Sequence, residues 1–197
     1  EMNTPAKNVA TVDAPTSALA TLAARFGVES NALFLKSLKD VAFRSPNVTT
    51  EQLMALVVVA NQYQLNPFTR ELYAFPEKGG GIVPIVSVDG WYRILNEQAA
   101  FDGIEYVEND VDDHGIFGEA TIYRKDRTHP TVVREYLSEV KRGTDPWKQY
   151  PHRMLRHKTI IQAIRLAFGF AGIYEPDEGE RILQAERVVR VEGSTKG

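Results

Sequence analysis

The sequence predicts an α+β fold, in which a small antiparallel sheet packs with helices. Apolar residues recur at helical spacing near the start of the chain, short β-like runs follow between residues 71 and 136, and helical spacing returns after Pro151. Strands grouped between helices differ from the strict alternation that builds a parallel sheet. The 197 residues suffice for one substantial domain.

The N-terminal region predicts a flexible leader followed by a helical pair. Residues 1–16 show no apolar period, so we expect them to carry no fold information. The first helix begins at Ser17 and stops at Gly27, and the second covers residues 32–43.

A third helix has clear boundary signals. Thr49 or Thr50 serves as its N-cap, and Gln52 lies in its first turn. It ends before Asn66 and Pro67, since the residue before a proline disfavours the helical conformation.

The middle of the chain predicts a hairpin and a short helix. The β-like runs 71–75 and 82–88 are separated by a loop, residues 76–81, that contains three successive glycines. We expect a hairpin with a mobile tip. Asp89 then predicts the N-cap of a short helix over residues 90–98.

Three further β-like runs complete the predicted sheet, at residues 104–107, 120–124 and 131–136. An acidic turn separates the first two. The strong helical pattern after Pro151 ends near Gly169, and a more polar last helix is expected from Pro176.

Composition excludes several classes of protein. The chain has no apolar stretch of about 18 residues, which excludes a membrane protein, and it has no cysteine. Disulfides, thiol catalysis and cysteine-ligated metals are therefore excluded as well. The lack of cysteine and of a signal segment favours the cytoplasm.

Charge is strongly polarised along the chain although the net charge is only −3. Residues 101–120 include seven acidic residues and no Lys or Arg, whereas residues 147–174 include five basic residues and no acid. Surface helices usually mix both signs, so the second segment indicates a surface that meets an anion. A simple solvated face remains the alternative.

The late helix predicts where these cations point. Lys158, Gln162 and Arg165 share one polar stripe, with apolar residues such as Ile164 on another face, so we expect the cations to face outward. Phosphate is the candidate ligand. Further cations and aromatic residues that could contact phosphates or stack on bases are Arg70, Lys78, Arg124, Lys125, Arg127, Trp91, Tyr92, Trp147 and Tyr150. Each aromatic residue alone has a core position as its alternative.

Signals for catalysis are weak. The three glycines lack the Lys-Ser/Thr of a phosphate-binding loop, and the spacing of His152 and His157 does not suit zinc on one helix face. The acidic segment 101–120 could hold Mg²⁺ in a nuclease site, although a solvated loop fits its crowding better. A metal-dependent nuclease and a protein-binding adaptor remain alternatives.

Three blocks of the chain resemble the Bet/RecT family of phage single-strand annealing recombinases: residues 57–97, residues 122–130 with IYRKDRTHP, and residues 146–182 with RMLRHK and RLAFGFAGIY. The resemblance implies an ATP-independent protein, not an enzyme, that binds single-stranded DNA and the annealed duplex and assembles into rings or helical filaments. It implies no cofactor, with Mg²⁺ only aiding strand pairing. It also implies a DNA groove between sheet and helices.

The resemblance further implies which residues contact DNA. Close relatives have lysine at His152 and Pro176 and a longer basic insertion before Pro146, so contacts there are not carried over. The implied DNA-binding residues are Arg44, Arg70, Lys78, Lys125, Arg153, Arg156, Lys158 and Arg165.

Family resemblance also divides the chain into functional parts. Residues 17–182 are expected to form the DNA-binding and oligomerisation domain, and residues 183–197 a C-terminal tail. In the family a further C-terminal domain recruits an exonuclease and the host single-strand binding protein. We expect that domain to be absent and leave these two partners unassigned. The acidic segment is expected to face a neighbouring protomer or to repel DNA.

Overall fold

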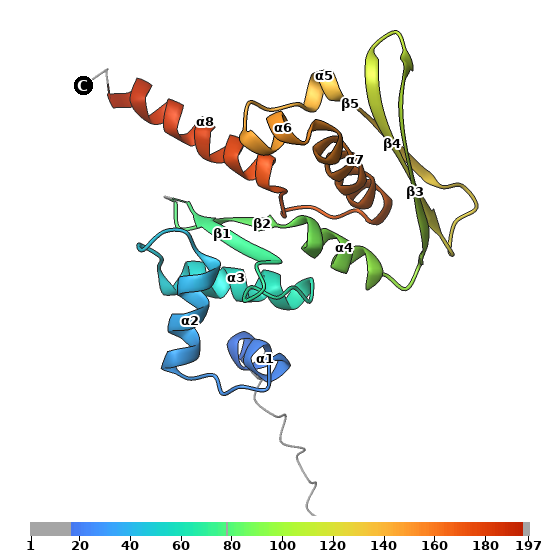
Figure 1. Ribbon diagram of the computed structural model, residues 1–197. Helices are drawn as coiled ribbons and strands as arrows, with labels where there is room; N and C mark the ends of the chain where they lie inside the picture. Colours follow the sequence, from blue (N-terminus) through green and yellow to red (C-terminus); the bar gives the residue numbers. More distant parts are fainter. Residues whose placement is uncertain (1–16, 78, 195–197) are drawn as a thin grey trace, which may run out of the picture.

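The computed structural model describes residues 17–77 and 79–194 and has the predicted α+β architecture (Figure 1). The expected leader, residues 1–16, lies outside the described residues. In chain order the elements are α1 (Ala18–Arg25), α2 (Ala32–Ala42), α3 (Thr50–Gln62), β1 (Leu72–Pro76), β2 (Ile82–Val86), α4 (Val88–Asn96), β3 (Phe101–Asp112), β4 (Gly115–Arg124), β5 (Thr131–Tyr136), α5 (Leu137–Val140), α6 (Asp145–Gln149), α7 (Pro151–Phe168) and α8 (Pro176–Ser194).

The three N-terminal helices begin at or within one residue of the expected positions, and the third has an expected N-cap, Thr49. The Ser17 side chain accepts a hydrogen bond from the backbone of Ala20 at the start of α1. Thr49 and Gln52 form a reciprocal capping box at α3, each side chain bonding the other's backbone N–H. The predicted helical pair and third helix are therefore confirmed.

The strands form two separate antiparallel sheets. β1 and β2 make the predicted hairpin, and the Gln52 amide donates to the carbonyls of Glu77 and Gly81 at its loop, which ties the hairpin to α3. β3, β4 and β5 form a second sheet in that order. The single sheet expected from the sequence is therefore divided, with α4 between its parts (Figure 1).

Two local expectations were wrong. The N-cap of α4 is Ser87, whose Oγ accepts from the Gly90 N–H, and Asp89 lies inside the first turn. The acidic turn expected between residues 107 and 120 is much shorter, because β3 extends to Asp112 and β4 begins at Gly115. Five of the seven acidic residues of segment 101–120 lie on β3, which is an edge strand, where charged side chains protect unpaired backbone groups from other chains.

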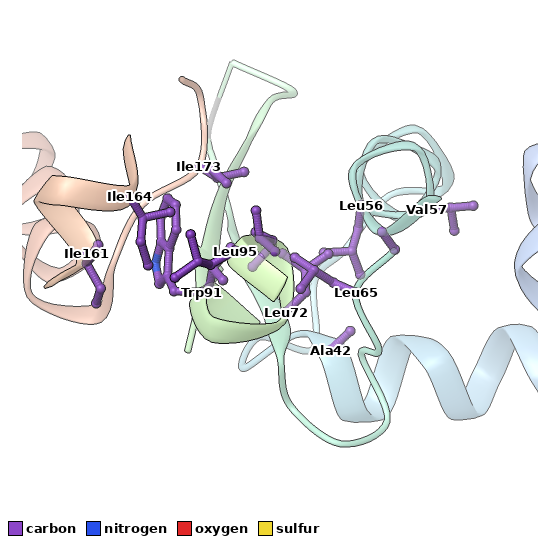
Figure 2. Close-up of a cluster of buried hydrophobic side chains, with 14 of the residues drawn as sticks. Ala42, Leu56, Val57, Leu65, Leu72, Trp91, Leu95, Ile161, Ile164 and Ile173 are labelled. Atoms are coloured by element: carbon purple, nitrogen blue, oxygen red, sulfur yellow. The ribbon is translucent and has the colours of Figure 1, made fainter. Parts of the chain in front are cut away.

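One hydrophobic core joins the N-terminal helices to α7. Figure 2 shows Trp91 of α4 near Ile161 and Ile164, with Leu72 and Leu56 further toward α3. Trp91 is completely buried. Because α4 contributes to packing on both sides, the hairpin layer and the α7 layer are held in one structure.

α8 returns beside α7 through a short connection. Gly169 ends α7 with a φ of 72°, and Gly172 has a φ of 74°, both in the left-handed region that glycine tolerates. Tyr174 then pairs with β2: its N–H donates to Pro84 (3.0 Å) and its carbonyl accepts from Val86 (2.8 Å). The start of α8 is thereby fixed near β2 and α7.

Candidate nucleic-acid interface

The predicted DNA-contacting cations are distributed over several elements. Lys78 lies outside the described residues, and the other seven lie within them. Three are exposed and stand in loops: Arg44 after α2, Arg70 before β1 and Lys125 after β4. The remaining four are all on α7, namely Arg153, Arg156, Lys158 and Arg165.

Gly118 of β4 sets the close approach of α7 to the sheet. A Cβ atom at this position would lie 2.5 Å from the Tyr106 hydroxyl and 2.8 Å from Thr159 Oγ1. Thr159 is fully buried and donates to the carbonyl of Leu155 one turn earlier. The buried row of α7 therefore faces the sheet, which leaves Arg153 and Arg156 on the exposed side.

Arg153 and Arg156 border a small polar hollow of about 150 Å³, which is also lined by Tyr106, Glu108 and His152. His152 Nδ1 lies 2.6 Å from Glu108 Oε1, and the Tyr106 hydroxyl donates to Glu108 Oε2 at 3.2 Å. Both carboxylate oxygens of Glu108 therefore have partners, and these are His152 and Tyr106 rather than the two arginines. Among the side chains that the structure describes, those of residues 17–77, 79–110 and 113–185, no carboxylate forms an ion pair with either arginine.

His157 indicates the positive potential at this end of α7. Its pKa is lowered by burial first and then by the charges of Arg156 and Arg153. A protonated imidazole is disfavoured there because it would add a third cation in a partly buried position. The same potential attracts an anionic ligand.

Lys158 and Arg165 are arranged differently from the expected outward stripe. Lys158 Nζ is paired with Glu175 and lies 3.7 Å from Glu178 Oε1, while Arg165 Nη1 lies 2.7 Å from Glu178 Oε2. The side chain of Lys158 is only 12% exposed. The outward expectation was wrong because the chain folds back after α7 and places two carboxylates, Glu175 just before α8 and Glu178 on α8, over this part of α7. Their role in DNA binding stays a prediction.

Glu175 is nearly buried, and this burial raises its pKa to about 7 although Lys158 favours the charged form. The acidic residues Glu175, Asp177 and Glu178 come directly after the acid-free segment in the sequence. That abrupt change of sign was the signal that could have predicted an ion-paired contact between the two helices.

The aromatic residues divide into buried and accessible ones. Trp91 and Trp147 are both completely buried, so neither can stack on a base in this conformation. Tyr150 is 50% exposed, and the Arg153 guanidinium lies 4.7 Å from its ring centroid. Tyr150 is therefore available beside the exposed arginines. Tyr92 is half-buried.

Arg124 is engaged within the protein. Its guanidinium is paired with Asp126 at 2.6 Å, donates to the carbonyl of Ala167 and lies 4.6 Å from the Phe168 ring centroid. It therefore holds the C-terminal end of α7 against the sheet. Of the neighbouring cations considered from the sequence, Lys125 and Arg127 are exposed.

Two sets of cations were missed by sequence reasoning. Lys36 and Lys39 border a hollow of about 600 Å³ beside Arg44, whose guanidinium lies 5.0 Å from the Tyr73 ring centroid. Arg181 of α8 is exposed beside another hollow that includes Arg165. The spacing of Lys36 and Lys39 on one helix was a visible signal, whereas Arg181 depended on where α8 docks.

Neither a metal site nor a membrane span emerges from the described part of the chain. No group of three or more His, Asp or Glu side chains there could hold a metal ion. None of the described helices is both long and apolar enough to cross a bilayer.

Comparison with known proteins gives two matches. The model of the RecT family matches residues 29–190. Over 184 residues the chain is 46% identical to the recombination protein Bet of Escherichia phage lambda, an alignment that covers 85% of this chain and 68% of that protein. Both matches include α7 and its exposed arginines.

Proposed function

The chain belongs to the RecT family, and from this premise we propose that it binds single-stranded DNA and anneals complementary strands in phage recombination. The observation that supports this most directly is the pair Arg153 and Arg156. Both guanidinium groups are exposed, and neither is paired with a described carboxylate. They stand on a helix that contains no acidic residue.

An annealing protein has to neutralise phosphates while it leaves the base edges free to test a second strand. Arginine and lysine contacts to the backbone meet this requirement, because phosphate contacts position a strand without reading its sequence. The exposed ring of Tyr150 adds a surface on which a base can stack without using its pairing edge. Arg153 and Arg156 are the centre of the proposed strand path.

The other predicted cations extend this path in the proposal. Lys125 and Arg70 are exposed in loops of different layers, and Arg44 is exposed at the end of α2. If about five phosphates are neutralised per protomer, the logarithm of the DNA-binding constant falls against the logarithm of the salt concentration with a slope of about −3.5.

Annealing itself is driven by base pairing, so we propose that it requires neither ATP nor a bound metal.

We further propose that protomers assemble head to tail into a ring or helical filament. Exposed Leu33 stands at an apolar hollow of about 470 Å³ lined by Phe26, Phe34 and Phe68, and Lys36 and Lys39 follow it on α2. β3 lies at the opposite end of the molecule (Figure 1). It exposes both apolar and acidic residues. These residues are Val107, Asp102 and Glu105.

The β3 surface of a second copy fits the α2 surface, because the named charged residues of β3 are acidic and those of α2 are basic. Both surfaces also expose apolar side chains. Different patches on one molecule that bind each other give a heterologous contact, which closes into a ring or continues as a helix. Neighbouring protomers then share one strand and increase its effective affinity. This gives the acidic segment the role of facing a neighbour.

The test compares Arg153→Ala with Arg156→Ala against a matched control, Lys141→Ala with Arg142→Ala, in the loop after α5. Binding of a labelled oligonucleotide is measured from 50 to 200 mM salt, and annealing is followed with complementary strands. Loss of two phosphate contacts reduces the salt slope by about 1.4. Wild-type binding and annealing in the α7 variant would refute the proposed path.

The same assay distinguishes the two alternative functions. Shortened labelled strands in the presence of Mg²⁺ would indicate a metal-dependent nuclease. Absence of salt-dependent binding to DNA would indicate a protein-binding adaptor. Equal annealing rates with and without ATP are expected from the proposed function.

A further inference from the structure

The junction of α7 and α8 contains a second hollow, separate from the one beside Arg153. It has a volume of about 400 Å³ and is lined by Arg165, Tyr174, Glu178, Arg181 and two apolar residues, Ile182 and Ala185. Arg165 comes from α7 and Arg181 from α8. Two cations from different helices therefore meet at one opening that Tyr174 borders on another side.

Glu178 neutralises one of these cations in the described conformation. Both of its carboxylate oxygens accept from Arg165 Nη1, at 2.8 and 2.7 Å, and Oε1 also accepts from the Gln162 amide at 3.1 Å. A carboxylate held by a guanidinium in this way has the charge and the acceptor atoms that a phosphodiester oxygen pair would offer. Arg165 thus already binds an internal substitute for phosphate.

Arg181 has no such partner. It is exposed on α8, and it forms no ion pair within residues 17–77, 79–110 and 113–185, whose side chains the structure describes. A long cation beside an opening of this size can reach a ligand without moving the helix. The junction therefore presents one cation that is ready to bind and one that is occupied by Glu178.

The base of α8 is firmly attached, which restricts any exchange to the side chain of Glu178. Tyr174 is hydrogen-bonded to β2 through both its N–H and its carbonyl, and Asp177 accepts from Trp147. Gly179 packs directly on the Ile85 side chain, where a Cβ would overlap. Glu178 itself is about one-fifth exposed, so it can turn toward solvent while α8 stays in place.

We propose that the α7–α8 hollow is a phosphate-binding site for a nucleic-acid strand, formed by Arg165 and Arg181 and gated by Glu178. In the closed state the Glu178 carboxylate occupies Arg165, and in the open state a phosphodiester group replaces it. Tyr174 borders the site and supports the adjacent sugar or base. The inference rests on the proposed DNA binding, and it adds Arg181 as a contact and Glu178 as an internal competitor.

The competitor role predicts that two changes on one helix act in opposite directions. Glu178→Gln keeps the size of the side chain and removes its charge, so a labelled oligothymidine is expected to bind about threefold or more tightly. The salt slope should steepen by about 0.7, the value for one added phosphate contact on a single strand. Arg181→Ala is expected to weaken binding and to make the slope shallower by a similar amount.

Glu180→Gln is the matched control, because Glu180 is an exposed residue of the same helix and its loss changes the net charge equally. Affinity in this variant is expected to stay within twofold of wild type. Circular dichroism and thermal unfolding verify that each variant is folded. Arg181→Ala removes only an exposed side chain and provides a test even if Glu178→Gln disturbs the fold.

The outcomes separate this inference from the proposed function. Binding by the wild type with no gain in folded Glu178→Gln, or with no loss in Arg181→Ala, overturns the gated site and leaves DNA binding intact. An equal gain in Glu178→Gln and Glu180→Gln also overturns it, since net charge then explains the effect. Failure of the wild type to bind at 50 mM salt overturns the proposed function and this site together.

Discussion

The indole Nε1 of Trp147 donates a 2.7 Å hydrogen bond to Oδ2 of Asp177, and this bond joins α6 to the first turn of α8. Trp147 is completely buried and packs with Val140 and Leu155 in a small second core. The contact connects the acid-free helix region to the acidic helix that covers it. It therefore helps decide where the carboxylates of α8 lie.

Asp177→Ala is expected to lower the free energy of unfolding by about 1–3 kcal/mol, because it leaves a buried indole N–H without an acceptor. Chemical denaturation measures the change. Trp147→Phe removes the donor, and the double variant should lose less than the sum of the two single losses if the bond carries the effect. Strictly additive losses would show that Asp177 acts in another way.

Gly118 tests the packing that positions the exposed arginines. Gly118→Ala places a methyl group 2.5 Å from the Tyr106 hydroxyl and 2.8 Å from Thr159 Oγ1, so we expect a loss of about 1–3 kcal/mol from overpacking. Gly103→Ala on β3 is the control, because nothing lies within 4 Å of the position that its added Cβ would take. Equal stability of the two variants would contradict the close approach of α7 to β4.

Glu175 predicts an unusual dependence of stability on pH. Burial raises its pKa from 4.5 to about 7, so its favourable contribution is complete below pH 4.5 and is lost as the pH rises through 7. Glu175→Gln stays neutral throughout. Relative to wild type it should therefore gain about 1–3 kcal/mol in unfolding free energy between pH 5 and pH 8. Unfolding curves recorded at several pH values measure this difference.

His157 supplies a control of opposite sign. Its pKa is lowered by burial and by Arg156, so its contribution is present above pH 6.5 and is lost as the pH falls. Relative to wild type, the unfolding free energy of His157→Gln should increase toward acidic pH, whereas that of Glu175→Gln should increase toward alkaline pH. Parallel curves for wild type and Glu175→Gln would contradict the assigned burial of Glu175.

Local signals in the sequence were sufficient for the order of elements. Capping residues such as Thr49 and the glycine after α7 act within a few residues, and they place helix ends almost without reference to the rest of the fold. The length of β3 was underestimated because its acidic residues have low strand propensity. Pairing with β4 overrides that propensity, as in the Asn109 and Phe117 pair.

The candidate interface was less predictable than the fold. The helical period correctly places Lys158 and Arg165 on one stripe, but it contains no information about which element covers that stripe. The cover is α8, whose position depends on the long-range pairing of Tyr174 with β2. For the same reason the sequence did not distinguish the exposed arginines of α7 from the paired ones.

Assembly through α2 is tested by reversing charge. In the proposed contact, Lys36→Glu with Lys39→Glu places like charges opposite Asp102 and Glu105 of the neighbouring protomer, so it is expected to shift the protein toward smaller species in sedimentation velocity. Leu33→Asp should act similarly by disfavouring contact at the apolar hollow. Binding of a short oligonucleotide by the monomer should remain, because α7 is unchanged.

Restoration of the contact is the stringent part of this test. Adding Asp102→Lys and Glu105→Lys to the α2 charge-reversed variant exchanges the two charges, and it should recover the large species if these surfaces meet. The β3 variant alone should dissociate like the α2 variant. Mixing the two single-surface variants should recover large species in which the variants alternate, because each then meets oppositely charged surfaces on the other at both contacts. Unchanged assembly in both single-surface variants would place the protomer contact elsewhere on the molecule.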